Sequence, residues 1–253
     1  MLALEVQTYI HGLTSWIIVL IGYTYWIVFM LKYFKVKKPL LPYVSMVGFC
    51  LGTFYLAPGI TFLNLAFTGS NLDPTIYFWM SYVLNPVGTF LVVYLGFSVF
   101  QPKYKKYAGY AYFALWVAYW ILLFGFPEIS FEVVPRGEVL DANLTGALRY
   151  ITAFNILTVL VLISTGFFRL SLKMKKSGAP KADVQKLFMI GLGWLLFSIA
   201  SVTDAIAPGS LIYVVLIGRL IMALSIFLIF QGFMPPKPTF TEVPKISENS
   251  ANE

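Results

Sequence analysis

The sequence contains very little charge, and this absence excludes a water-soluble domain. Charged residues make up 11% of the 253 residues and hydrophobic residues 59%, whereas soluble domains carry about 25% charged residues. So few charges could not cover a surface that faces water. The composition therefore predicts an integral membrane protein whose main partner is the lipid bilayer.

Cysteine and histidine are almost absent, which excludes most metal and cofactor chemistry. Cys50 is the single cysteine, so no disulfide can form within the chain. His11 is the single histidine, and we expect it at the membrane interface. A bis-histidine haem needs two histidines and a zinc site needs several ligands. We therefore expect neither a metal nor a cofactor.

Catalytic and photoreceptor signatures are also missing. The sequence has no Walker loop, no Gly-x-Ser-x-Gly and no His-Glu-x-x-His. The last apolar stretch has Arg219 as its only charge, and it lacks the lysine with which retinal would form a Schiff base. The sequence therefore predicts no catalytic residue, and we expect a protein that is not an enzyme.

Long apolar runs dominate what is present. A helix needs about 20 apolar residues to cross the hydrocarbon core of a bilayer. Seven stretches meet this requirement, at residues 8–33, 41–67, 75–100, 104–126, 146–170, 184–207 and 210–233. The predicted fold is an all-α integral membrane protein, with a bundle of seven transmembrane helices over residues 1–234. The polar residues 235–253 predict a disordered cytoplasmic tail.

Basic residues follow every second stretch and predict the orientation of the bundle. They are Lys32, Lys35, Lys37, Lys38, Lys103, Lys105, Lys106, Arg169, Lys173, Lys175, Lys176, Lys181, Lys186, Lys237 and Lys245. Lys and Arg accumulate in cytoplasmic loops. We therefore expect the N-terminus outside and the C-terminus inside, in the plasma membrane. This topology accounts for the net charge of +7 without a nucleic-acid partner.

Short patterns recur in the first three and the last three stretches. Lys-Val-Lys-Lys at residues 35–38 closes the first stretch, and Lys-Met-Lys-Lys at residues 173–176 closes the fifth. With the fourth stretch between the two triplets, this predicts a parallel 3+1+3 repeat. Basic loops and helix-ending prolines can also produce such matches without duplication, so both explanations stay open.

Four polar residues inside the stretches form the candidate ligand-binding site. Asn85, Asn155 and Arg219 each lie about ten residues from an outer end, which at 1.5 Å per residue is roughly 15 Å deep, near the midplane. Asp204 lies higher, within reach of the long Arg219 side chain. In one interpretation Arg219 binds a small anionic or amphiphilic ligand, the asparagines orient it, and Asp204 is a counter-ion or gate. In the other, these residues are a structural network that holds the helices together.

Proline and glycine mark irregular and closely packed helices. Pro58 and Pro86 predict interruptions of the second and third stretches, and such breaks often border cavities in membranes. Gly48 and Gly52 form a pair of small residues four positions apart, which predicts close packing against another helix.

The longest outer connection, residues 127–145, has features of its own. Residues 131–134 predict a short strand or hairpin over the mouth of the bundle. Asn143, with a threonine two positions later, begins a glycosylation sequon. Both features suit a segment on the outer side of the membrane.

The end of the seventh stretch resembles a known family. Leu-Ile-Phe-Gln-Gly-Phe at residues 228–233, followed by Pro235 and Pro236, is similar to the last helix of the seven-helix sensor modules of prokaryotic histidine kinases. The topology and the spacing of the stretches are similar too. The resemblance implies sensing in the membrane. A short tail stands where those proteins continue into a kinase, so the implied output passes to a cytoplasmic or membrane protein partner through the lysine-rich loops.

Three functions remain open. The first is a receptor-like sensor with a small-ligand pocket in the outer half of the bundle. The second is a small-solute transporter, because the 3+1+3 layout is similar to that of the SWEET family, although its Pro-Gln motif is missing. Transport predicts matching breaks in related stretches. The third is a non-catalytic subunit of a larger membrane complex, which predicts a lipid-facing groove and no enclosed polar cavity.

Overall fold

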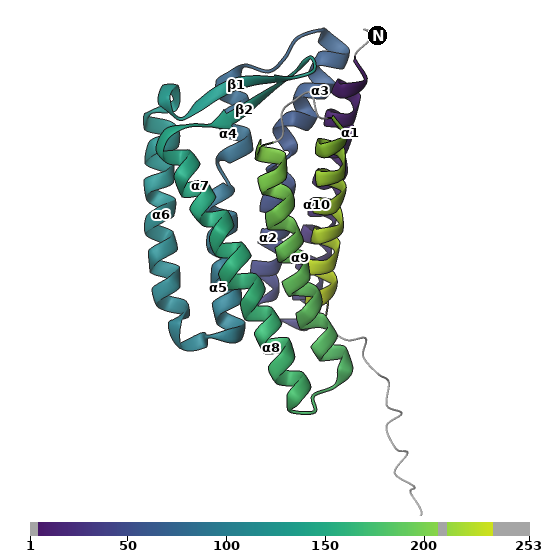
Figure 1. Ribbon diagram of the computed structural model, residues 1–253, viewed down its shortest axis with the longest axis vertical. Coiled ribbons are helices and arrows are strands. Elements are labelled where there is room, and N and C mark those ends of the chain that lie inside the picture. Colours follow the sequence, from purple (N-terminus) through teal and green to yellow (C-terminus); the bar gives the residue numbers. More distant parts are fainter. Residues whose placement is uncertain (1–4, 207–211, 235–253) are drawn as a thin grey trace, which may run out of the picture.

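Ten α-helices and one two-stranded hairpin make up the part of the chain that the computed structural model describes, residues 5–206 and 212–234 (Figure 1). In chain order they are α1 Val6–Val36, α2 Leu41–Thr53, α3 Leu56–Thr68, α4 Pro74–Tyr82, α5 Asn85–Phe100, α6 Lys105–Gly125, β1 Phe131–Arg136, β2 Val139–Leu144, α7 Gly146–Thr158, α8 Ser164–Lys176, α9 Lys181–Ile206 and α10 Ile212–Phe233. The predicted tail, with Lys237 and Lys245, lies outside the described residues.

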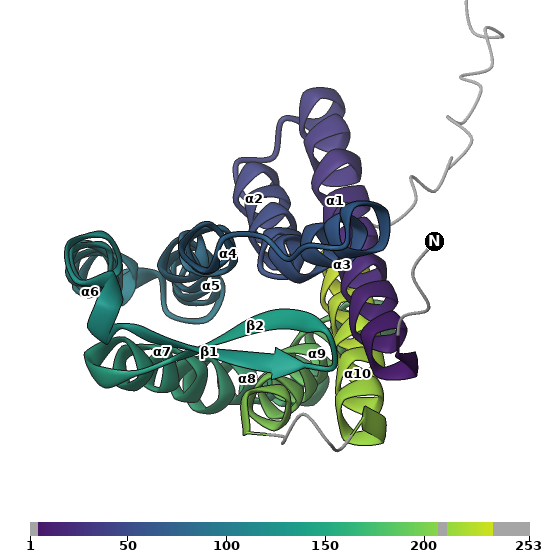
Figure 2. The same cartoon turned by 90° about the horizontal axis from the view of Figure 1, so that it is seen from above.

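The helices group into seven segments that are long and apolar enough to cross a membrane, as the sequence predicts. We call them spans one to seven: α1, α2 with α3, α4 with α5, α6, α7 with α8, α9, and α10. Consecutive spans contact one another and α10 contacts α1, so the spans form a closed ring (Figure 2). Large apolar side chains such as Leu20, Tyr110 and Phe227 are exposed on its outside. The fold is compatible with a multi-pass membrane protein.

Spans two and three are broken, but about one turn before the prolines that cause the breaks. α2 and α3 are separated at residues 54 and 55, ahead of Pro58, and α4 and α5 at residues 83 and 84, ahead of Pro86. Proline lacks the N–H that would bond to the carbonyl four residues earlier, and its ring clashes with that carbonyl. The helix is therefore distorted in the turn that precedes the proline. At the second break the indole of Trp120 donates a 2.9 Å hydrogen bond to the carbonyl of Val83.

Span five contains an irregularity that no proline signals. Val159–Ile163 form a π-helical turn between α7 and α8. The hydroxyl of Ser164 donates to the carbonyl of Val159, five residues back, over 3.2 Å. Single π-turns often mark functional sites, and this one borders the cavity described below.

All described lysine clusters gather at one end of the bundle, which we call the lysine end. α1, α5, α8 and α10 finish there and α2, α6 and α9 begin there (Figure 1). The opposite end carries the β1–β2 hairpin and is called the hairpin end. The structure thus brings separate loops into the two charge-segregated ends that the sequence predicts.

The hairpin crosses the end of the ring between α4 and α7 (Figure 2), in agreement with the prediction for residues 131–134. β1 and β2 pair antiparallel, with Phe131 opposite Leu144 and Arg136 opposite Val139. The turn between them contains Gly137 at a φ of 66°, a conformation that favours glycine.

Side chains from three parts of the bundle hold the hairpin in place. The Tyr77 hydroxyl of α4 donates to the Asp141 carboxylate over 2.8 Å. The Asn71 amide, between α3 and α4, donates to the Glu138 carbonyl over 3.0 Å. The Glu138 N–H donates to the Thr8 hydroxyl of α1, also over 3.0 Å. The hairpin is therefore an integral part of this end of the bundle.

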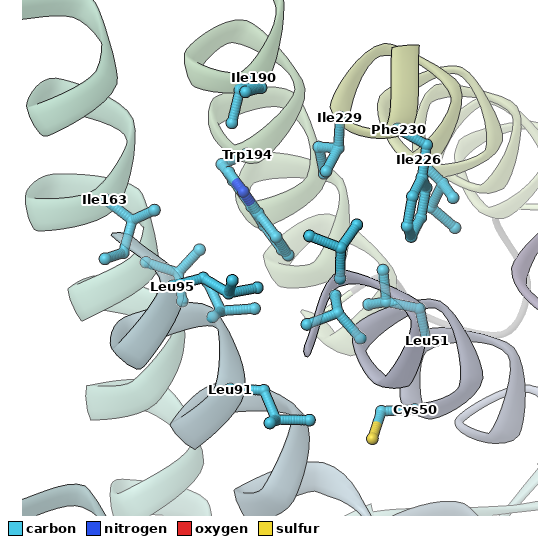
Figure 3. Packing of buried hydrophobic residues seen from close by; sticks show 14 of the residues in the cluster. Cys50, Leu51, Leu91, Leu95, Ile163, Ile190, Trp194, Ile226, Ile229 and Phe230 are labelled. Atoms are coloured by element: carbon cyan, nitrogen blue, oxygen red, sulfur yellow. The ribbon is translucent and has the colours of Figure 1, made fainter. Parts of the chain in front are cut away.

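The main core lies inside the ring, where side chains of α2, α5, α8, α9 and α10 converge. Trp194 projects from α9 toward the space between Leu95 of α5 and Leu51 of α2 (Figure 3). A smaller cluster at the hairpin end contains Tyr77 and Ala142, so the hairpin shares in the core.

Glycines allow α1 and α2 to approach closely, as predicted for Gly48 and Gly52. A Cβ added at Gly22 of α1 would lie 2.7 Å from the Cα of Gly52, and one at Gly48 would lie 3.0 Å from the carbonyl oxygen of Gly22. These are backbone atoms and cannot rotate away. Only glycine at these positions permits the contact.

We expect Gly22→Ala to destabilise the fold by about 1–3 kcal/mol, because the two helices must separate to admit the methyl group. Unfolding in a detergent–SDS titration measures the change. Gly125→Ala is the matched control, since a Cβ at Gly125 meets nothing within 4 Å, and a change within about 0.5 kcal/mol is expected there. Equal stability of the two variants would contradict the close helix contact.

Candidate functional site

Arg219 of α10 is buried in the ring and bound to the start of α1. Its side chain is 2% exposed. One guanidinium nitrogen, Nη1, donates to the carbonyl oxygen of His11 over 2.6 Å, to the Ser15 hydroxyl over 2.7 Å and to the Thr14 hydroxyl over 3.2 Å. His11 is itself 2% exposed, so it faces other helices and lies near the start of α1. Its backbone carbonyl helps to hold a buried cation.

The Arg219 charge is compensated by Asp204, as the predicted reach of its side chain allows. Nε of Arg219 lies 3.6 Å from Oδ1 of Asp204 on α9. The Tyr55 hydroxyl lies 3.2 Å from the other carboxylate oxygen and 2.8 Å from the sulfur of Met222. The Tyr55 ring covers the guanidinium, with its centroid 5.2 Å from Cζ. Because Tyr55 lies in the break of span two, the break places an aromatic ring and a hydroxyl beside the ion pair.

The two asparagines are not part of this ion-pair cluster. The hydrogen bonds that the structure describes for Arg219 lead to α1, whereas Asn85 and Asn155 line a separate cavity. The predicted four-residue site is therefore divided in two. The division arises because Arg219 faces the junction of α10 with α1 and α9, and the asparagines face the interior between α5, α7 and α9.

The cavity measures about 60 Å³ and lies between spans two, three, five and six. Most of its wall is apolar, from residues of α2, α5 and α9 that include Trp194. Its polar lining consists of Asn85, Thr89, Asn155, Ser198 and Ser201. No charged side chain lines it. The cavity is a polar patch in an apolar surrounding, as in many small-ligand sites.

Irregular helix segments position the asparagines at the cavity. Asn85 starts α5 directly after the break in span three. Asn155 lies one turn before the π-turn of span five and is 3% exposed. Ser198 and Ser201 are three residues apart and so share one face of α9. The polar wall thus depends on two distorted helices and one continuous helix.

Two of these polar groups have no hydrogen-bond partner in the described part of the chain. They are the amide oxygen of Asn155 and the hydroxyl of Ser198, which is 1% exposed. By contrast, Ser201 donates to the carbonyl of Phe197 over 2.8 Å, and Thr89 donates to the carbonyl of Asn85 over 3.1 Å. Buried polar groups are nearly always bonded, so Asn155 and Ser198 call for a bound molecule, a ligand or water.

Sequence reasoning missed Ser198, Ser201 and Tyr55. A signal for the serines existed, because Ser198, Ser201 and Asp204 recur every three residues along an apolar helix and so lie on one side. Nothing comparable marks Tyr55, because its position depends on where the helix break falls. His, Cys, Asp and Glu form no group of three that could hold a metal among the described residues.

Comparison of the chain with protein-family models, with curated proteins and with solved structures finds no match. The site is therefore interpreted from its own geometry.

We expect Arg219→Leu to destabilise the protein by about 3–5 kcal/mol, because it leaves the Asp204 carboxylate, which is only 15% exposed, beside an apolar residue. The double variant Arg219→Leu/Asp204→Leu removes both charges and should be more stable than the single variant by more than about 1 kcal/mol. SDS unfolding of wild type, both single variants and the double variant gives the coupling energy. If the loss of stability in the double variant equals the sum of the losses in the two single variants, the two charges do not stabilise each other.

Proposed function

We propose that this protein is a multi-pass membrane sensor that binds a small molecule in the central cavity. Binding would shift the helices and so change their positions at the lysine end. The observation that carries the proposal is the pair of buried, unpartnered polar groups, on Asn155 and Ser198, in a cavity between four spans. Buried polar groups are nearly always hydrogen-bonded, and a small molecule in the cavity that both groups line would supply their partner. A cavity of this kind also counts against a passive complex subunit.

The helix that carries two of the five polar residues of the cavity wall continues to the lysine end. α9 runs without a break from Lys181 to Ile206 and bears Ser198 and Ser201. Near the lysine end, the Ser171 hydroxyl of α8 donates to the Val184 carbonyl of α9 over 2.9 Å. A small shift of α9 on ligand binding would therefore carry the lysines of α8 with it, as in shear motions of packed helices.

The charge pattern supports an orientation for this sensor. Positive residues collect at the lysine end, and such residues accumulate on the cytoplasmic side of membranes. The N-terminus and the hairpin would then be outside, and the lysine end would contact a protein partner in the cytoplasm or in the membrane. The plasma membrane is the proposed location, and no catalytic activity is proposed.

Transport is a weaker alternative. A transporter built from two related triplets would be expected to have matching breaks, but the breaks in spans two and three have no counterpart in α9 or in α10, the described parts of spans six and seven. The predicted 3+1+3 repeat therefore gives only weak support to transport.

A cavity-filling variant can serve as a mimic of the occupied state. We expect Ser198→Val to shift the distance between spin labels at Lys103→Cys and Lys175→Cys by about 1–2 Å, the usual size of a helix shift. Both lysines are exposed, and Cys50→Ala removes the single native thiol. Double electron–electron resonance in nanodiscs measures the distance.

Ile199→Val is the matched control, because Ile199 neighbours Ser198 but is 50% exposed on the outside of the bundle. It should leave the distance unchanged. Identical distances in wild type and Ser198→Val would count against sensing. Solute flux through proteoliposomes that Ser198→Val abolishes would favour transport instead.

A further inference from the structure

The cavity has no counter-charge for an ionic ligand. Its polar lining is limited to asparagine, serine and threonine side chains. The nearest buried cation in the predicted site, Arg219, is already paired with Asp204 and bonded to α1. An ion in an apolar cavity without a partner carries a large desolvation cost. This geometry disfavours the anionic ligand that the sequence suggested.

The open hydrogen-bonding groups can each donate and accept. The Asn155 amide has an unpartnered oxygen and an N–H₂ group, and the Ser198 hydroxyl is both donor and acceptor. The hydroxyl protons of Thr89 and Ser201 are already donated to backbone carbonyls of their own helices. A ligand group that both donates and accepts, such as a primary amide or a hydroxyl, therefore complements Asn155 and Ser198.

The size and the remaining wall limit the rest of the ligand. Val92 and Trp194 are among the apolar residues that face the same space. The volume is about 60 Å³, and about 10–15 Å³ suffices for one water. The space therefore suits a molecule of roughly four to six non-hydrogen atoms, with a short hydrocarbon part against the apolar wall.

We infer that the cavity binds an uncharged molecule of about this size, whose primary amide or hydroxyl bonds to Asn155 and Ser198. The inference rests on the proposed function, because it names the class of ligand for the same cavity. We infer a neutral ligand because the buried positive charge of Arg219 joins α1, α9 and α10, and no charge remains at the cavity to pair with an ion.

Propionamide and propionate are matched probes, since they have the same number of non-hydrogen atoms and differ in charge. 1-Butanol tests the hydroxyl. Saturation-transfer NMR with the full chain in nanodiscs should show saturable binding of propionamide or 1-butanol, at least tenfold tighter than that of propionate. Propionate binding as tight as either neutral probe would overturn the inference.

Two serine variants locate the binding. Ser198→Ala should weaken propionamide binding about two- to tenfold, the usual effect of one lost hydrogen bond. Ser201→Ala, on the same face of α9, should leave it unchanged, because the Ser201 hydroxyl proton is donated to its own helix. Asn155→Leu should abolish binding, and thermal unfolding shows that each variant is folded. Equal binding by wild type and Ser198→Ala would place the probe elsewhere and overturn the inference.

The outcomes separate this inference from the proposed function. If neutral probes bind but the lysine end does not respond to Ser198→Val, the ligand class stands and sensing falls. If the lysine end responds and no neutral probe binds, the ligand class is wrong and sensing stands.

Discussion

The buried charge of Arg219 is the constraint on which the assembly of this bundle depends. A guanidinium inside an apolar bundle is costly unless several groups surround it. The groups that do so are the carboxylate of Asp204, the ring of Tyr55 and the carbonyl of His11. They come from α9, from the break in span two and from α1. Satisfying one charge therefore fixes how the first two spans meet the last two and closes the ring. Apolar contacts alone would specify this less sharply, because lipid tails are as apolar as the helix surfaces.

Charged and uncharged polar residues on neighbouring turns of α9 have different roles. Asp204 binds the arginine, and Ser201 and Ser198, about one and two turns earlier, line the cavity. The cavity is thereby kept free of charge, although the same helix carries the acidic partner of the ion pair. Any molecule that shifts α9 from the cavity side would also move Asp204 relative to Arg219. The proposed sensing would act through this coupling, because a ligand in the cavity would then affect the ion pair that closes the ring.

The distorted segments explain why a cavity exists at this place. The break before Asn85 and the π-turn after Asn155 both interrupt regular side-chain packing beside α9. Backbone groups released by such distortions need partners inside a membrane, and the Trp120 indole supplies one at the break of span three. The hairpin lies across one end of the ring and is bonded to α1 and α4.

The sequence by itself determined the seven membrane-length helices, the two charge-segregated ends, the hairpin and the close glycine contact. These features follow from composition and from the spacing of residues close together in the chain, so they can be predicted without knowing how distant segments pack. It also indicated that Arg219 and Asp204 could meet, because the long arginine side chain can reach the higher position of Asp204.

The tertiary structure decided which polar residues share a site. Depth along a helix can be read from residue counts, but the direction in which a side chain points around the ring cannot. Asn85, Asn155 and Arg219 suggested one layer by depth, yet helix rotation divides them between a neutral cavity and an ion pair. Tyr55 and Ser198 entered these sites for the same reason, since helix breaks and helix faces are set by packing between segments distant in the chain.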